Sequence, residues 1–184
     1  MSERPLTGRL LVASPAMRDP NFERTVVLVL EHGDDGALGV VLNRPSGTDL
    51  FEALPRWDAL AAAPHVVFVG GPVAPSAAIC LGRPGGGGHE GCQPLFDGLC
   101  SVDLERDPAE LARPPAHIRV FAGYAGWGPG QVEGEVEAGA WYVLDALPGD
   151  ALSPQPTDLW AAVLRRQGGT LALLVNFPAD PTMN

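Results

Sequence analysis

Hydrophobic and polar positions divide the chain into short apolar runs separated by turn residues. Runs at 9–14, 25–31 and 37–43 predict three strands. The last two flank His32-Gly33-Asp34-Asp35-Gly36, a composition typical of a β-hairpin turn. Polar residues stand at the ends of these runs, so candidate chemistry is expected at strand ends and loops. Later apolar runs predict strands at 65–69, 77–81, 99–104, 118–122, 140–145 and 170–176.

Short helices are predicted where capping residues precede helical spacing. Asp49 with Glu52 matches a capping box, and Asp107 followed by Pro108 combines an N-cap with a proline at the first helical position. Two further helices are expected over 131–138, with Glu133 and Glu137 on a solvated face, and from Thr157 to Gly168. Segment 123–130, Gly-Tyr-Ala-Gly-Trp-Gly-Pro-Gly, reads as a loop that suits either a binding wall or a packed corner.

The alternation of short strands and short helices indicates a mixed fold in a single domain spanning residues 1–184. We expect loose termini at 1–8 and 177–184. Residues 83–91 contain four successive glycines and predict a flexible surface loop. This loop lacks the Lys-Ser/Thr ending of a phosphate cradle.

Charge argues against one class of partner. The net charge is −10, and all twelve basic residues are arginines scattered along the chain. Phosphate backbones are bound mainly by clustered basic side chains, so non-specific nucleic-acid binding is disfavoured.

Cysteine usage and hydropathy bear on the cellular compartment. Cys80, Cys92 and Cys100 are an odd number without a CxxC pair, which favours reduced thiols in the cytoplasm. His89 with Cys92 and Cys100 matches no common zinc spacing, so no metal or other cofactor is predicted. No apolar run approaches the ~20 residues of a membrane span, and no membrane partner is expected.

Several motifs together resemble the YqgE/AlgH family. The match runs from about Arg9 to Asn176 and rests on motifs that occur in order: Ala13-Ser14-Pro15, Asp19-Pro20, Phe22 to Val27, Glu31-His32, Gly39, Asn43-Arg44-Pro45, Gly70-Gly71-Pro72-Val73, Gly123 to Trp127, Gly130-Gln131 and Trp141. This resemblance implies an α+β domain in which a bent mixed or antiparallel sheet forms a pseudo-barrel with short helices packed outside. Family members are bacterial proteins often labelled transcriptional regulators, a label that rests on genetic association.

Three function hypotheses follow. The first is a non-enzymatic regulatory or ligand-binding protein that recognises a small molecule or a protein, alone or as an oligomer. Arg44 could pair with a carboxylate or phosphate at such a site, although a strand end with a surface guanidinium is the plainer interpretation. The candidate residues are His32, Asn43, Arg44, Gly70, Gly71, Tyr124 and Trp127.

The second hypothesis is a small hydrolase-like enzyme. Glu31 and His32 would supply acid/base groups, and Ser14 or a cysteine a nucleophile, with Asp19 orienting a histidine. The sequence lacks a GxSxG elbow, an HExxH motif and a Walker motif, which favours the first hypothesis and predicts no catalytic residues. The third is a DNA-binding regulator, which the acidic charge and the absence of a recognisable DNA-reading module oppose.

Overall fold

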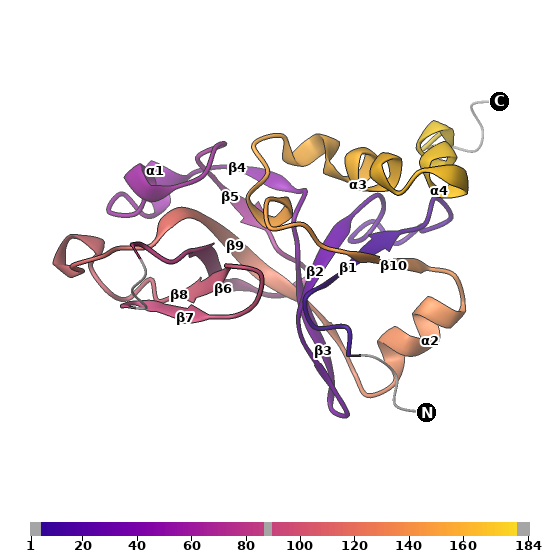
Figure 1. Ribbon diagram of the computed structural model, residues 1–184, viewed down its shortest axis with the longest axis horizontal. Helices are drawn as coiled ribbons and strands as arrows, with labels where there is room; N and C mark the ends of the chain where they lie inside the picture. Colours follow the sequence, from indigo (N-terminus) through magenta and orange to yellow (C-terminus); the bar gives the residue numbers. More distant parts are fainter. Residues whose placement is uncertain (1–4, 87–89, 180–184) are drawn as a thin grey trace.

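The structure, a computed structural model, describes residues 5–86 and 90–179 and contains a curled, mainly antiparallel sheet that forms a half-barrel with short helices around it (Figure 1). This confirms the predicted α+β fold. The strands are β1 Arg9–Ala13, β2 Val26–Gly33, β3 Gly36–Val41, β4 Pro45–Asp49, β5 Val66–Val69, β6 Val73–Arg83, β7 Cys92–Pro94, β8 Cys100–Val102, β9 Ala116–Trp127 and β10 Trp141–Asp145.

Within the described residues, four α-helices and several 3₁₀ turns surround this sheet. The helices are α1 Leu50–Ala53, α2 Gln131–Glu137, α3 Leu159–Gln167 and α4 Gly169–Leu173, and the 3₁₀ turns are η1 Asp58–Leu60, η2 Pro108–Glu110, η3 Asp150–Leu152, η4 Pro156–Asp158 and η5 Leu174–Asn176. The Asp49 carboxylate accepts from Glu52 N–H, and that of Asp107 accepts from Ala109 N–H, so both predicted N-caps are confirmed.

Strand order is β10-β1-β2-β3-β9-β6-β8-β7, and β5 joins β9 in parallel and β4 in antiparallel orientation. The long strand β9 therefore pairs with β3, β5 and β6. In Figure 1 it runs from the half that holds α1 into the half that holds β1, β2 and β10.

The alternation of side chains along β1 explains how helices cover both faces of the half of the sheet that holds β1, β2 and β10. Leu10 and Val12 face one cluster, which includes Val163 and Leu164 of α3. Leu11 and Ala13 face the opposite cluster, which includes Val132 of α2 and the indoles of Trp127 and Trp141. Successive strand side chains point to opposite faces, so the sheet is sandwiched between α3 with α4 on one side and α2 on the other (Figure 1).

The cysteine prediction was wrong for two of the three residues. Cys92 and Cys100 form a disulfide, and only Cys80 is free, with burial raising the pKa of its thiol. The reason is the pairing of β7 with β8, which brings the Cα atoms of Cys92 and Cys100 to 5.5 Å. These two sulfurs are therefore not thiolate ligands, and His89 lies outside the described residues.

Two element predictions were also wrong. Residues 123–127 continue β9 instead of forming a loop, because they complete the ladder along β3, where Trp127 pairs with Ala37. Residues 170–176 form α4 and η5 instead of a strand. Leu171, Leu174 and Val175 pack on the α3 side of the core at helical spacing, a pattern that a short apolar run does not distinguish from a buried strand.

The described part of the N-terminal segment is held by hydrogen bonds, although the sequence predicted a loose terminus there. Leu6 N–H donates to His32 Nδ1 at 3.0 Å, and Gly8 N–H donates to the Val29 carbonyl at 2.9 Å. Across the described ranges, no helix is long and apolar enough to cross a membrane.

A buried arginine ties the other half of the sheet to the C-terminal segments. Arg119 of β9 donates to the carbonyls of Ala63, at 2.6 Å, and Ser153, at 2.9 Å, while its guanidinium lies 4.3 Å from the centre of the Phe68 ring. Burial lowers the pKa of Arg119 to about 10. Carbonyl dipoles and an aromatic face stabilise the charge, and the buried Nε has no hydrogen-bond partner among the described residues.

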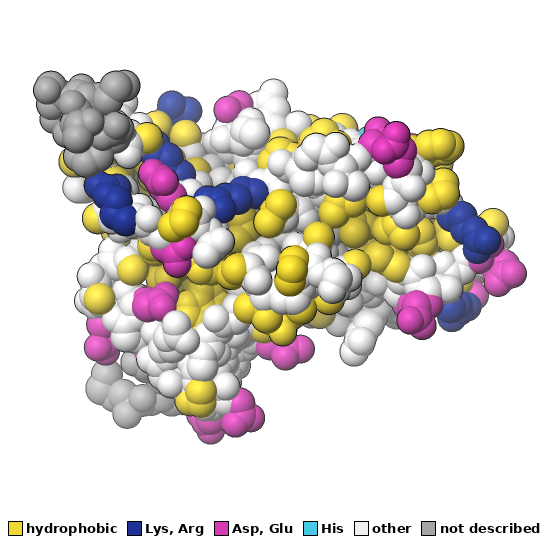
Figure 2. Space-filling model, turned by 180° about the vertical axis from the view of Figure 1, so that it is seen from behind, with side chains coloured by type: hydrophobic (Ala, Val, Ile, Leu, Met, Phe, Trp, Pro, Cys, Tyr) yellow, Lys and Arg dark blue, Asp and Glu magenta, His cyan; other side chains and the backbone are white. Residues whose placement is uncertain are grey.

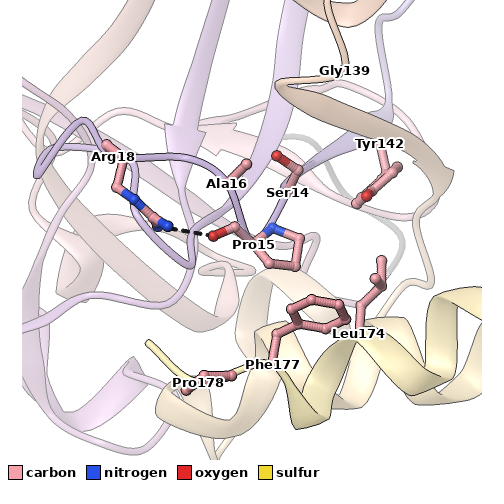
Figure 3. Close-up of a pocket in the computed structure, with 9 residues that line it drawn as sticks. All are labelled: Ser14, Pro15, Ala16, Arg18, Gly139, Tyr142, Leu174, Phe177 and Pro178. Carbon is pink, nitrogen blue, oxygen red and sulfur yellow. Dashed lines mark hydrogen bonds between the residues drawn. The ribbon is translucent and has the colours of Figure 1, made fainter. Parts of the chain in front are cut away.

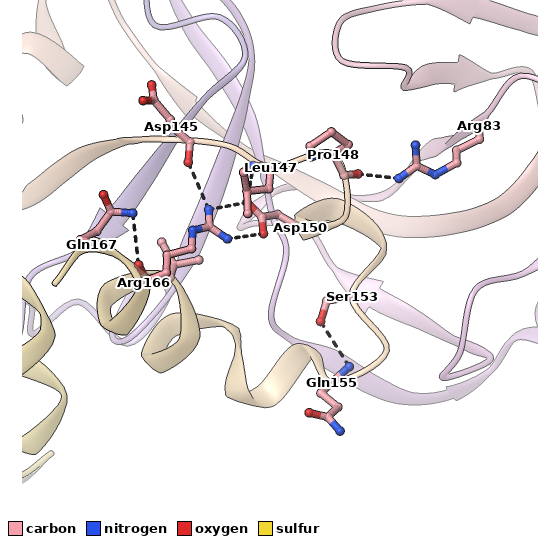
Figure 4. Close-up of polar contacts among 10 residues, drawn as sticks. Arg83, Asp145, Leu147, Pro148, Asp150, Ser153, Gln155, Arg166 and Gln167 are labelled. Carbon is pink, nitrogen blue, oxygen red and sulfur yellow. Dashed lines mark hydrogen bonds and ion pairs between the residues drawn. The ribbon is translucent and has the colours of Figure 1, made fainter.

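Asp150 organises the link between β10 and α3 (Figure 4). Its two carboxylate oxygens each accept from Arg166 of α3 at 2.7 Å, and Oδ2 also accepts from the Leu147 backbone N–H at 2.7 Å. Asp150 is buried, and two parallel N–H···O bonds are the strongest geometry for an arginine and a carboxylate.

Asp150→Ala should therefore lower the free energy of unfolding by about 2 kcal/mol, because it leaves Arg166 and the Leu147 N–H without their acceptor. Asp145→Ala is the matched control, since Asp145 pairs with Arg9 in a largely exposed position and should change stability by less than about 0.5 kcal/mol. Urea denaturation measures both. Equal effects of the two substitutions would contradict this account.

Candidate functional site

The candidate site lies where β1 ends. Ser14 follows β1, and its backbone N–H donates to the Ala140 carbonyl at 2.9 Å. Pro15 has no N–H to donate, so the ladder stops there. Met17 N–H donates to the Ser14 carbonyl at 3.0 Å, which closes a turn with Pro15 in a favoured position. The same motif, Ser14-Pro15, contributed to the family resemblance.

A cavity of about 510 Å³ opens at this turn (Figure 3). Tyr142 enters it from β10, where it pairs with Val12 of β1, and Leu174 and Phe177 line it from the C-terminal segment. Figure 3 shows the turn on one side and the C-terminal helices on the other. The volume lies within the range of small-molecule sites.

Ser14 lines this cavity, but its hydroxyl oxygen is buried and not exposed to the cavity. The residue is 4% exposed, and its Oγ has no hydrogen-bond partner among the described residues. Buried polar groups in native proteins almost always have a partner, because an unsatisfied one costs about 1–3 kcal/mol.

Two other polar residues, Tyr142 and Arg18, also line the cavity. The Tyr142 hydroxyl forms no hydrogen bond within the described part of the chain. Arg18 donates once, from its guanidinium to the Pro15 carbonyl at 3.0 Å, and has no carboxylate within ion-pair distance in that part. Most of its donors are therefore free.

Arg24 holds the C-terminal wall of the cavity in place. Its guanidinium lies 4.5 Å from the centre of the Trp160 ring and donates to the Phe177 carbonyl. Trp160 in turn donates from its indole N–H to the Ala13 carbonyl at 2.9 Å, next to Ser14. These contacts connect the turn, α3 and the segment that carries Phe177.

The sequence-predicted residue His32 is fully engaged in structural contacts. Its Nδ1 accepts from Leu6 N–H, and its Nε2 donates to Glu133 Oε1 at 2.6 Å. This bond lowers the pKa of Glu133, whose predicted position on a solvated face was wrong. Glu31 is exposed beside it. With both ring nitrogens bonded, His32 has no free nitrogen for acid/base chemistry.

Trp127 and Tyr124 lie on β9. The Trp127 indole N–H donates to Glu135 Oε2 at 3.0 Å, and the Trp141 indole N–H donates to the same oxygen at 2.8 Å. Phe22 packs on both indoles. Tyr124 is partly buried against the α3 side of the core. Glu135 thus fastens α2 to two strands.

Asn43 and Arg44 support the loop that precedes β2. Asn43 Oδ1 accepts from Val26 N–H at 3.0 Å, and its Nδ2 donates to the Arg24 carbonyl at 2.8 Å. Arg44 donates to the carbonyls of Asn21 and Glu23, and burial lowers the pKa of its guanidinium.

Gly70 and Gly71 pass against β9 instead of facing a cavity. Gly70 N–H donates to the Ala122 carbonyl, and its own carbonyl accepts from Val41 N–H, both at 2.8 Å. Gly71 has a φ of +155°, and a Cβ there would lie 2.1 Å from the Tyr124 carbonyl carbon. Close approach of backbone to backbone therefore explains this pair of glycines.

The seven predicted positions therefore do not converge on one site. His32 and Trp127 line a shared hollow of about 400 Å³ with the hairpin turn, whereas the other five line neither cavity described here. Ser14 and His32 are separated by the length of β1, since Gly8 bonds to β2 three residues before His32 and Ser14 lies beyond Ala13. The hydrolase alternative gains nothing from this arrangement.

Tyr142 and Phe177 belong to the candidate site but were missed in the sequence. Tyr142 occupies an ordinary position in an apolar strand, and Phe177 was assigned to the C-terminal tail. Their approach to Ser14 depends on β10 pairing with β1 and on α4 replacing the predicted strand. Neither the strand pairing nor the helix can be predicted from the residues next to Tyr142 or Phe177.

The fold and its contacts define an α+β half-barrel protein in which most of the sequence motifs serve packing and one cavity, of mainly apolar lining, opens where β1 ends. Residues 10–172 match the family model described as AlgH-like. The chain therefore belongs to the AlgH-like family, as the resemblance predicted.

Relatives support this assignment over nearly the whole chain. The UPF0301 protein SCO2948 of Streptomyces coelicolor is 52% identical over 97% of this chain and 95% of its own length. A UPF0301 protein of Mycobacteroides abscessus is 47% identical over 96% of this chain and 87% of its own.

Two solved structures share the fold. The crystal structure of DIP2367 from Corynebacterium diphtheriae superposes with a TM-score of 0.87 at 34% identity and covers 96% of this chain and 95% of that one. The solution structure of the AlgH protein from Pseudomonas aeruginosa gives a TM-score of 0.71 at 32% identity, covering 97% of each chain.

The glycine contact with β9 predicts a large stability effect. Gly71→Ala should lower the free energy of unfolding by about 3 kcal/mol or more, because the added Cβ overlaps the Tyr124 backbone. The matched control is Gly47→Ala, where a Cβ meets nothing within 4 Å. Guanidinium denaturation of both variants measures the difference, and a tolerated Gly71→Ala would refute the close approach.

The His32–Glu133 bond predicts a pH dependence. A carboxylate with a lowered pKa stabilises the folded state above its ordinary pKa of 4.5, and this contribution is lost as the pH falls through the lowered value. Glu133→Gln should therefore lower the free energy of unfolding by up to about 1 kcal/mol near neutral pH, and by progressively less as the pH falls. The effect is no larger than this because Glu133 is partly exposed to solvent. Urea denaturation at several pH values tests this, with the exposed Glu137→Gln as control. A pH-independent difference would contradict it.

Proposed function

We propose that this protein is a non-enzymatic, ligand-binding regulatory protein of the cytoplasm whose ligand is a small organic molecule bound in the cavity at Ser14. One observation carries the proposal. A cavity of about 510 Å³ is lined mainly by apolar side chains, and the hydroxyl of Tyr142, which forms no hydrogen bond within the described residues, lines the same space. A ligand in the cavity can give the Tyr142 hydroxyl a hydrogen-bond partner and cover the apolar walls.

The walls of the cavity support a binding role over catalysis. Apolar side chains, including Leu174 and Phe177, form most of the lining, and the polar residues Ser14, Arg18 and Tyr142 also line it. This combination is typical of sites that hold a ligand by shape and orient it by a few hydrogen bonds. Among the described residues, no histidine or carboxylate lines the cavity where it could activate Ser14 as a nucleophile.

A thermal-shift screen of small molecules tests the proposal, with two tryptophan variants as a matched pair. Leu174→Trp fills the cavity, whereas Leu173→Trp places the same side chain at the adjacent, exposed position. A ligand at one hundred times its Kd stabilises the wild type by about 2.7 kcal/mol, which raises Tm by roughly 5–10 °C in a chain of this size.

Ligands that stabilise the wild type and Leu173→Trp but not Leu174→Trp would support this site. Stabilisation retained in full by Leu174→Trp would place the ligand elsewhere and contradict the proposal.

A further inference from the structure

We infer that the ligand of the cavity at Ser14 is an uncharged, flat aromatic molecule that carries one hydroxyl-like group. Its rings would lie among the ring side chains of Pro15, Tyr142 and Phe177, and its polar group would bind the Tyr142 hydroxyl. This inference rests on the proposed function and adds the chemical class of the ligand.

Ring side chains form much of the cavity wall. Pro15 comes from the turn after β1, Tyr142 from β10, and Phe177 and Pro178 from the C-terminal segment (Figure 3). The Phe177 ring is 55% exposed, so a ligand that covers it removes apolar surface from water. Aromatic rings in offset-stacked or edge-to-face contact gain stability beyond this burial. A flat aromatic ligand therefore fits these walls better than a saturated ligand of the same carbon skeleton.

The Tyr142 hydroxyl is the polar side-chain group that the cavity offers to a ligand. Tyr142 is half-buried, and its hydroxyl end points into the space between the Ser14 turn and Phe177 (Figure 3). A phenolic hydroxyl donates and accepts, so one hydroxyl or carbonyl on the ligand can pair with it. The Ser14 hydroxyl oxygen is buried beneath the cavity surface and takes no part in this contact.

The charges around the cavity disfavour an ionised ligand. Arg18 is the ionised residue among the described residues that line the cavity. Its guanidinium lies on the far side of Pro15 from the Tyr142 hydroxyl and donates to the Pro15 carbonyl at 3.0 Å (Figure 3). A charged group placed among the rings would lose hydration without gaining a counter-ion, which costs free energy. The ligand is therefore uncharged.

Isothermal titration near neutral pH with four probes that share one carbon skeleton tests the class. The probes are 2-naphthol, naphthalene, naphthalene-2-carboxylate and decahydro-2-naphthol. We expect 2-naphthol to bind the full chain about fivefold more tightly than naphthalene, because it adds one neutral hydrogen bond. It should bind at least about tenfold more tightly than the ionised carboxylate and at least about threefold more tightly than its saturated analogue.

The variant Tyr142→Phe removes the hydroxyl and keeps the ring. It should reduce the preference for 2-naphthol over naphthalene to about twofold or less, while naphthalene affinity stays within about twofold of the wild-type value. Tyr124→Phe is the matched control, since Tyr124 is the other tyrosine of the chain and does not line this cavity. It should leave the preference unchanged.

Equal binding of 2-naphthol and naphthalene-2-carboxylate, equal binding of 2-naphthol and its saturated analogue, or equal effects of Tyr142→Phe and Tyr124→Phe would overturn the inference. In that case the cavity itself would still stand if Leu174→Trp abolished binding of 2-naphthol and Leu173→Trp did not. Failure of every probe to bind the wild type would also overturn the inference, whereas the proposed function is judged separately by the wider thermal-shift screen.

Discussion

The half-barrel depends on the close approach of the Gly70-Gly71 backbone to β9. Gly70 bonds to Ala122 of β9 on one side and to Val41 of β3 on the other, and Gly71 passes so near Tyr124 that a Cβ has no space. Because β9 pairs with β3, β5 and β6, this contact joins the strands of both halves. Closure at this point leaves β1 and β10 at the far end of the sheet, beneath the C-terminal helices (Figure 1).

That arrangement explains why the motifs of the sequence and the cavity of the structure lie in different places. Trp127, Trp141 and Glu135 fasten α2, and Asn43 and Arg44 fasten the loop before β2. These residues hold the sheet that presents Ser14. Apolar side chains also cover a broad area of the surface on the half that contains α1 and β4 to β8, with Phe51, Val69 and Val73 exposed there (Figure 2).

Local patterns predicted the elements whose signals are local. The hairpin of β2 and β3, the caps at Asp49 and Asp107, and α2 follow from turn composition, capping residues and helical spacing. Contacts between distant segments were not predictable in this way. Gly123 to Trp127 became strand because β3 offered an edge, Cys92 met Cys100 because β7 paired with β8, and Tyr142 reached Ser14 because β10 paired with β1. The polar residues with the strongest motifs proved to be structural, while the cavity at Ser14 depends on contacts between distant segments.

Chemical-shift mapping tests the central claim, that the Ser14 cavity binds the ligand, most directly. An ¹⁵N-labelled sample is titrated with a ligand that stabilises the protein, and the perturbed backbone amides are placed on the structure. The account predicts that the largest shifts surround the cavity, at Ser14, Gly139, Tyr142 and Phe177. Shifts centred instead on His32 and Trp127, or on the exposed apolar surface around Phe51 and Val69, would contradict it.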